Sequence, residues 1–127
     1  MEFLPLYGEW EHPGLTKRYS LVARHAMNYI HEEYWMIESF RHKRLKNLYE
    51  RGERRGLPTE NIERLERVIA ALDGARTLDD LTNPSFRLHP LTGDLAGQWS
   101  IRVNRNWRIV FRFEDGKATE VDLLDYH

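Results

Sequence analysis

The chain ends in Asp125, Tyr126 and His127, which place a carboxylate, a phenol and an imidazole next to one another. His89 and Arg108 lie upstream. Cleavage of RNA without a metal ion needs a base for the 2′-hydroxyl, an acid for the leaving 5′-oxygen and cationic donors on the phosphate. Imidazole suits the proton transfers because its ordinary pKa is about 6.5, and the planar fork of arginine suits phosphate. If the fold brings these five residues together, they can form an RNA-cleaving site.

Strands with alternating side chains are expected to position most of these residues. Four segments with a period of two follow Pro84, at residues 86–89, 99–104, 107–113 and 118–123. Alternation gives one face the apolar side chains Phe86, Leu88, Trp99, Ile101, Val103, Trp107, Ile109, Phe111 and Phe113. The other face receives Arg87, His89, Ser100, Arg102, Asn104, Arg108, Arg112, Glu120 and Asp122. Such a polar face either binds a charged partner or is an ordinary solvated face with cross-strand ion pairs.

Helices are predicted before these strands. Apolar residues recur at three- and four-residue spacing over 15–34, around 45–49 and from Pro58 to Gly74, and one further turn is predicted at 77–80. Glu60–Arg64 and Glu63–Arg67 pairs are expected on the outer side of the third segment. Residues 36–40 could form a short strand. Helices first and strands later predict an α+β fold, a small antiparallel sheet with helices packed on one face.

The composition is that of one folded domain. The 127 residues are 41% hydrophobic, too apolar for a disordered chain, and include no cysteine. The longest apolar run, 68–72, is far shorter than the ~20 residues of a membrane-spanning helix, and no secretory signal is visible. We therefore expect a cytoplasmic protein without a membrane partner. No His-x-x-x-His pair, glycine-rich phosphate loop or dinucleotide fingerprint is present, so neither a metal nor another cofactor is expected.

The net charge of −1 hides two basic stretches. Residues 41–55 carry seven basic and two acidic side chains, and residues 95–113 carry four arginines and no acid. Local basic surfaces of this kind can bind a polyanion, because charges act within about a Debye length, ~8–10 Å. The alternative interpretation is that these stretches are solvated faces of a helix and a strand.

Six segments within residues 36–127 carry a family resemblance. In order, they are Met36-Ile-Glu-Ser-Phe-Arg-His-Lys43, Arg87-Leu-His-Pro-Leu-Thr-Gly-Asp94, Trp99-Ser100, Asn104-Arg-Asn-Trp-Arg-Ile109, Phe111-Arg-Phe-Glu-Asp-Gly116 and Asp125-Tyr-His127. Together these motifs resemble the HigB toxins, the plasmid-maintenance killer branch of the RelE/ParE superfamily. The resemblance implies a compact sheet with helices on one side, and a ribosome-dependent endoribonuclease that cuts mRNA in the ribosomal A site without a metal. It also implies a HigA-type helix-turn-helix antitoxin that neutralises the toxin.

Carried over by position, the resemblance implies a catalytic set of His89, Arg108, Asp125, Tyr126 and His127, with Asn106 beside it. The family usually has lysine where this chain has Thr92, so one positive charge expected near the phosphate is missing. Arg87 and Arg102 are candidate substitutes for that charge. The basic stretch 41–55 is expected to contact ribosomal RNA, with Lys43, Arg44 and Lys46 as candidate contacts.

Two other functions are compatible with the same fold. A ParE-like toxin would inhibit gyrase by binding, and it would not need His89, Tyr126 or His127. A catalytically weakened family member would act through antitoxin binding, which Thr92 in place of lysine leaves open. Residues 1–35 are expected to be an N-terminal extension with an amphipathic helix that packs on the 36–127 domain, self-associates or contacts the antitoxin. Alternatively, Met36 is the true start.

Overall fold

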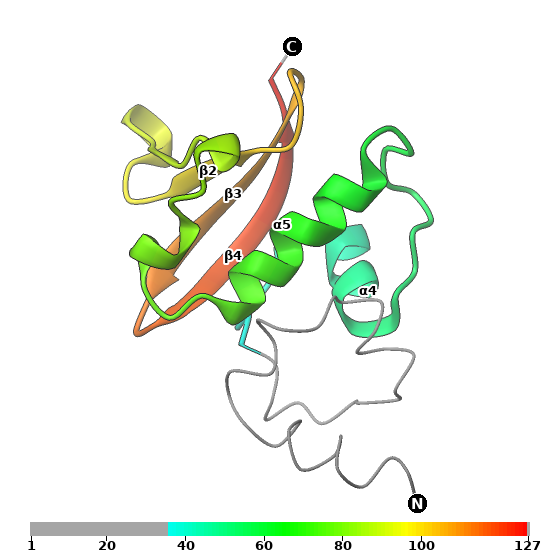
Figure 1. Ribbon diagram of the computed structural model, residues 1–127, viewed down its shortest axis with the longest axis horizontal. Coiled ribbons are helices and arrows are strands. Elements are labelled where there is room, and N and C mark those ends of the chain that lie inside the picture. Colours follow the sequence, from blue (N-terminus) through cyan, green and yellow to red (C-terminus); the bar gives the residue numbers. More distant parts are fainter. Residues whose placement is uncertain (1–35, 127) are drawn as a thin grey trace, which may run out of the picture.

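The computed structural model describes residues 36–126; residues 1–35 and His127 lie outside this range, as does the helix predicted at 15–34. Two helices, α4 (Lys43–Arg51) and α5 (Ile62–Gly74), precede a four-stranded sheet. Its strands β1 (His89–Pro90), β2 (Trp99–Arg102), β3 (Trp107–Glu114) and β4 (Lys117–Asp125) pair antiparallel in chain order. In Figure 1 α5 crosses the sheet and α4 lies beside α5. This arrangement confirms the α+β prediction.

Local capping defines the ends of the two helices. His42 begins α4 by accepting a hydrogen bond on Nδ1 from the Leu45 N–H at 3.2 Å, and Gly52 ends it in a left-handed conformation. Helix α5 begins at Ile62, so the predicted start at Pro58 is wrong. Asn61 has a positive φ of 62°, which a helical residue cannot adopt, and the chain turns there before the helix begins.

The predicted strand at 86–89 is also wrong. Asn83 accepts a hydrogen bond on Oδ1 from the Ser85 N–H at 2.9 Å and starts a short 3₁₀ helix, η3 (Pro84–Phe86). Arg87 then adopts a left-handed conformation with φ 49° and ψ 49°, so only His89–Pro90 remain extended. Two further 3₁₀ helices are η2 (Leu78–Leu81), where the turn at 77–80 was predicted, and η4 (Gly93–Leu95).

Two other predicted strands are shorter than expected. Residues 36–40 form a single parallel bridge, Phe40 to Val121, supported by backbone hydrogen bonds along the edge of β4 such as Val121 N–H to Ser39 O at 3.0 Å. The strand predicted at 99–104 ends at Arg102 because the Asn104 side chain hydrogen-bonds the turn that follows.

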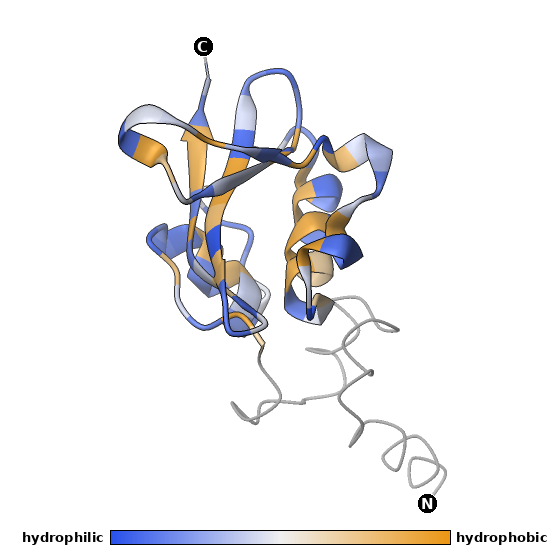
Figure 2. Ribbon diagram, turned by 90° about the vertical axis from the view of Figure 1, so that its left-hand side faces the viewer, coloured by the Kyte–Doolittle hydropathy of each residue, from blue (hydrophilic) through white to orange (hydrophobic). Residues whose placement is uncertain are grey.

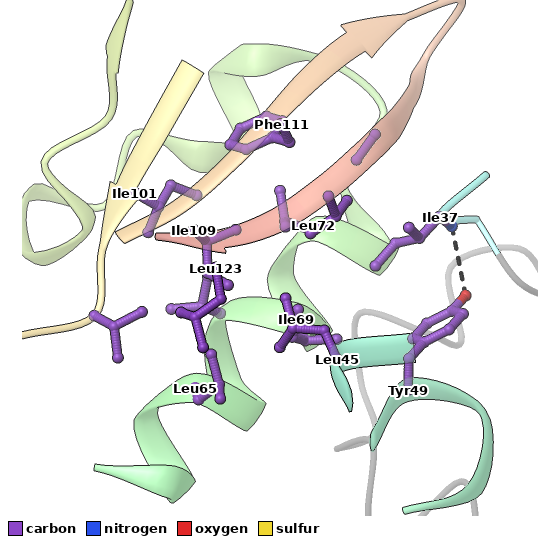
Figure 3. Close-up of a cluster of buried hydrophobic side chains, with 14 of the residues drawn as sticks. Ile37, Leu45, Tyr49, Leu65, Ile69, Leu72, Ile101, Ile109, Phe111 and Leu123 are labelled. Carbon is purple, nitrogen blue, oxygen red and sulfur yellow. Dashed lines mark hydrogen bonds between the residues drawn. The ribbon is translucent and has the colours of Figure 1, made fainter. Parts of the chain in front are cut away.

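The hydrophobic core lies between the helices and the apolar face of the sheet (Figure 3). Its central layer follows from strand register, since Ile101 pairs with Ile109 and Ile109 with Leu123. Leu65, Ile69 and Leu72 of α5 and Leu45 of α4 meet this layer and are buried. Figure 2 shows the hydrophobic stretches of both helices and of the strands interrupted by hydrophilic ones, as the periodicity predicted.

A buried polar group ties the start of the described chain to both helices. Asp73 on α5 accepts hydrogen bonds on Oδ1 from the Tyr49 hydroxyl at 2.5 Å and from the Met36 N–H at 2.9 Å. The Tyr49 oxygen also accepts the Ile37 N–H at 3.4 Å (Figure 3). Among residues 36–126 no helix is long and apolar enough to cross a membrane.

Candidate functional site

Strand register brings two arginines and a tyrosine together at one end of the polar face. Arg102 pairs directly with Arg108, so both side chains lie on the same face. The Tyr126 N–H donates to the Asn106 carbonyl at 2.5 Å, which continues the β3–β4 pairing beyond β4. Alternation then places Tyr126 on the face of Arg108, whose guanidinium carbon lies 5.1 Å from the centroid of the tyrosine ring. Figure 1 shows this end of β4 beside the β2–β3 connection.

The β2–β3 turn orients the Arg108 guanidinium. Asn104 Oδ1 accepts the N–H groups of Asn106 at 2.8 Å and of Trp107 at 2.9 Å, which fixes the turn. Arg108 Nη1 donates back to the carbonyls of Asn104 at 2.5 Å and Trp107 at 3.2 Å. Within residues 36–126 its Nε and Nη2 groups donate no hydrogen bond and form no ion pair. Among the described residues these donors are therefore available to an external anion.

Like charges surround Arg108. Burial lowers the pKa of Arg108 from its ordinary value, and the charges of Arg102 and Arg87 lower it further, whereas Tyr126 raises it. No carboxylate of the described range forms an ion pair with these arginines. We call Arg87, Arg102 and Arg108 the arginine cluster. Because guanidinium groups at close range repel one another, an anion bound among them would be strongly favoured.

Arg64 on α5 reaches the same end of the sheet, which the sequence did not indicate. Its Nε donates to the Val103 carbonyl at 2.9 Å, and its Nη2 donates to the carbonyls of Arg102 at 2.9 Å and Ser85 at 2.5 Å. Its guanidinium carbon lies 5.8 Å from the centroid of the Phe86 ring. The predicted outward pairing of Arg64 with Glu60 is therefore wrong, because these backbone acceptors turn the guanidinium toward the sheet.

The remaining members of the implied catalytic set are more dispersed. His89 is exposed on β1 opposite Ser100, on the same face as Arg108 but two strands away. Asp125 pairs with Trp107, and alternation puts it on the opposite face of β4 from Tyr126. His127 lies outside the described residues. The structure thus unites Arg108 with Tyr126, Arg102 and Arg87, and it places His89 on the same face, two strands from Arg108.

The candidate RNA contacts fall in separate places. Thr92 is exposed immediately before η4, and Asn106 contributes its backbone to the pairing with Tyr126. The last three candidates are exposed on α4, which Figure 1 places well away from the C-terminal end of β4. These three are Lys43, Arg44 and Lys46. In the described range, no three side chains of histidine, aspartate or glutamate lie close enough together to hold a metal ion.

Known proteins are similar to this chain in sequence. A family model for the RelE-like toxin of type II toxin-antitoxin system HigB matches residues 38–127. A Proteus vulgaris protein named Endoribonuclease HigB is 44% identical over 92 residues, which cover 72% of this chain and 100% of that relative. Toxin HigB-1 of Vibrio cholerae is 38% identical over 94 residues, which cover 72% of this chain and 98% of the relative. The resemblance seen in the motifs is thus confirmed, and the chain belongs to the HigB family of RelE-like toxins of type II toxin–antitoxin systems.

Proposed function

We propose that this toxin is an endoribonuclease that cleaves mRNA on the ribosome, with the arginine cluster as its phosphate-binding site. One observation carries the proposal. Arg108 is oriented by two backbone carbonyls and by the Tyr126 ring, and its remaining donors point to no partner within residues 36–126. A preorganised guanidinium of this kind is suited to a phosphate on which negative charge develops during the reaction. The Proteus vulgaris relative is itself named an endoribonuclease.

The chemistry follows from the groups available. The 2′-oxygen of one nucleotide attacks the adjacent phosphorus while the bond to the 5′-oxygen breaks, and one proton is removed and another supplied. Arg108, assisted by Arg102 or Arg87, holds the phosphate and stabilises the transition state. His89, Asp125 and His127 share the roles of base and acid. Tyr126 packs against Arg108 and orients either the nucleotide or a proton partner.

The partners follow from family membership and from surface charge. As the toxin of a toxin–antitoxin system, the protein has an antitoxin partner. We propose that this antitoxin is of the HigA helix-turn-helix type, and that the toxin acts in the cytoplasm, where ribosomes are. We further propose that residues 36–127 are the toxin domain and residues 1–35 an extension. The exposed side chains of Lys43, Arg44 and Lys46 would contact ribosomal RNA, an interaction that weakens steeply as salt rises.

A purified translation reaction tests the proposal. A defined mRNA is incubated with the full chain, with and without ribosomes, and cut sites are mapped by primer extension. We expect cuts only when ribosomes are present, and none with His127→Ala. Intact mRNA in the wild-type reaction would contradict the proposal and favour a gyrase-binding or weakened toxin. Thr92→Lys then separates these two, because a weakened nuclease would gain cleavage from the restored charge and a gyrase inhibitor would not.

A further inference from the structure

We propose that Arg64 is a positioning residue of the phosphate-binding site. Its guanidinium joins helix α5, the end of β2 and the turn before β1, and it thereby sets Arg87 and Arg102 beside Arg108. This inference rests on the proposed function, because it assigns a role in building the site that would bind the RNA phosphate. Neither the sequence motifs nor the family comparisons point to Arg64.

The hydrogen bonds of Arg64 converge on the two segments that carry the other arginines. One acceptor is the carbonyl of Arg102 itself, at 2.9 Å, and the next is the carbonyl of Val103, also at 2.9 Å. The third is the carbonyl of Ser85 at 2.5 Å, two residues before Arg87. Among the described residues, the Arg64 side chain makes all the hydrogen bonds that join α5 to these two segments.

Helix α5 is firmly packed around Arg64, so the backbone from which this side chain extends is held in place. The following residue, Leu65, is only 2% exposed in the core, and Ile69 one turn later is fully buried. The ring of Phe86 packs against the guanidinium at 5.8 Å and is itself buried. The planar guanidinium has five N–H donors, so its Nε and Nη2 can donate to three carbonyls at once. The compact ammonium of a lysine cannot reach all three.

The turn that Arg64 holds is strained at the residue that matters. Arg87 has φ 49° and ψ 49°, a left-handed conformation that residues other than glycine adopt only when surrounding contacts impose it. That conformation directs the Arg87 side chain, whose charge is felt at Arg108. Release of the Ser85 carbonyl would let the turn relax and carry Arg87 away from Arg108. The strain and the bond therefore point to the same role.

Arg64 also adds charge, so position must be separated from charge in any test. Burial lowers the pKa of Arg64 from its ordinary value, and the charges of Arg67 and Arg102 lower it further. Arg67 lies one turn along α5, is exposed and binds none of the three carbonyls. Arg67→Ala is therefore the matched control, since it removes one positive charge from the same helix and leaves the bridge intact.

The experiment follows the side-chain Nε–H NMR signals of the arginines while inorganic phosphate is added to the full chain. In the wild type we expect the signals of Arg87, Arg102 and Arg108 to shift together. In Arg64→Ala we expect Arg87 and Arg102 to lose this common response and the Kd for phosphate to rise about 10-fold. Arg67→Ala should stay within about twofold of the wild type. Arg64→Lys, which keeps the charge and is the milder change to the fold, should resemble Arg64→Ala in its signals.

Ribosome-dependent cleavage provides the second readout, at a temperature where melting curves show every variant folded. We expect kcat to fall about 10- to 100-fold in Arg64→Ala, because a displacement of about 1 Å in a positioned group can cost that much. The proposal is overturned if Arg64→Ala or Arg64→Lys keeps the common phosphate response, or if Arg67→Ala loses as much as Arg64→Ala. If the wild type binds phosphate through all three arginines, Arg64→Ala loses this common response and the wild type cuts no mRNA, the nuclease function is refuted and the role of Arg64 is supported.

Discussion

Two regions of the same sheet face use arginine in opposite ways. Arg108 and Arg112 lie four residues apart on β3, on the same face. Arg112 Nε lies 3.4 Å from Glu120, and Arg41 Nε lies 3.5 Å from the same carboxylate. We call Arg41, Arg112 and Glu120 the paired edge. In the arginine cluster, by contrast, Arg108 bonds only to carbonyls among residues 36–126 and is surrounded by like charges.

The β4 residues that face the two arginines create this difference. The β3–β4 register shifts between Val110 and Arg112, so Arg112 pairs with Thr119, and Glu120 beside this pair has a positive φ of 51°. The Glu120 carboxylate lies beside Arg112 and forms an ion pair with it, whereas Arg108 is opposed by Leu124 and receives no carboxylate. A count of arginines therefore does not identify a binding site. The presence or absence of a carboxylate partner does.

The largest expected contrast is in cleavage rate. Arg108→Ala should reduce kcat about 10²- to 10³-fold, as the loss of one transition-state donor does in other enzymes. Arg112→Ala should change the rate by less than about threefold, because it removes a surface ion pair worth little. Single-turnover cleavage on programmed ribosomes measures both. Equal losses in the two variants would show that the paired edge is part of the site.

Salt dependence sharpens the comparison further. Arg102→Ala should weaken binding of a non-cleavable 2′-deoxy oligonucleotide several-fold, and it should lower the slope of log Kd against log salt concentration by about 0.7 to 1. Arg112→Ala should change the slope much less, since the Arg112 guanidinium is held in an ion pair with Glu120. Fluorescence anisotropy over a series of salt concentrations measures the slopes. An unchanged slope in Arg102→Ala would mean that its guanidinium contacts no phosphate.

A smaller effect is expected from the ring that packs on Arg108. Tyr126→Leu should weaken oligonucleotide binding about two- to fivefold, which corresponds to the ~0.5–1 kcal/mol of an exposed cation–π contact. Tyr126→Phe keeps the ring and should bind within about twofold of the wild type by the same reasoning. The same anisotropy assay compares them. If leucine binds as well as phenylalanine, the ring does not preorganise Arg108.

The smallest effect concerns stability beside the paired edge, at the first turn of α4. Burial lowers the pKa of His42 below its ordinary value of 6.5; Asp122 raises it and Arg44 lowers it by smaller amounts. The unfolded chain therefore takes up this proton more readily, so the stabilisation is complete above about pH 6.5 and is lost as the pH falls below it. Protonation also removes the Nδ1 acceptor that caps α4, a contribution of about 1 kcal/mol.

Urea unfolding at a series of pH values tests this. His42→Asn retains a capping oxygen and does not titrate. As the pH falls, the unfolding free energy of the wild type should therefore decrease more than that of the variant. A difference that does not change with pH would show that His42 titrates as in the unfolded chain.

Local patterns accounted for much of the fold and part of the site. Helical spacing identified the buried residues of α5, and alternation correctly put Arg102 and Arg108 on one face, because both periodicities are properties of a few consecutive residues. The motifs identified the family. The prediction of a strand at 86–89 was wrong because the Asn83 side chain caps a short 3₁₀ helix there, and this local hydrogen bond outweighs the alternating pattern.

The fold class, the core and the arginines of one sheet face could be predicted from the sequence, since each depends on local pattern or composition. Which of these arginines has a carboxylate partner and which has none depends on contacts between segments that are remote in the chain. Glu120 forms ion pairs with both Arg41 and Arg112, and Arg64 reaches carbonyls 21 to 39 residues away. Hydrogen bonds and ion pairs act over a few ångströms, and such distances between remote segments are fixed only when the chain packs.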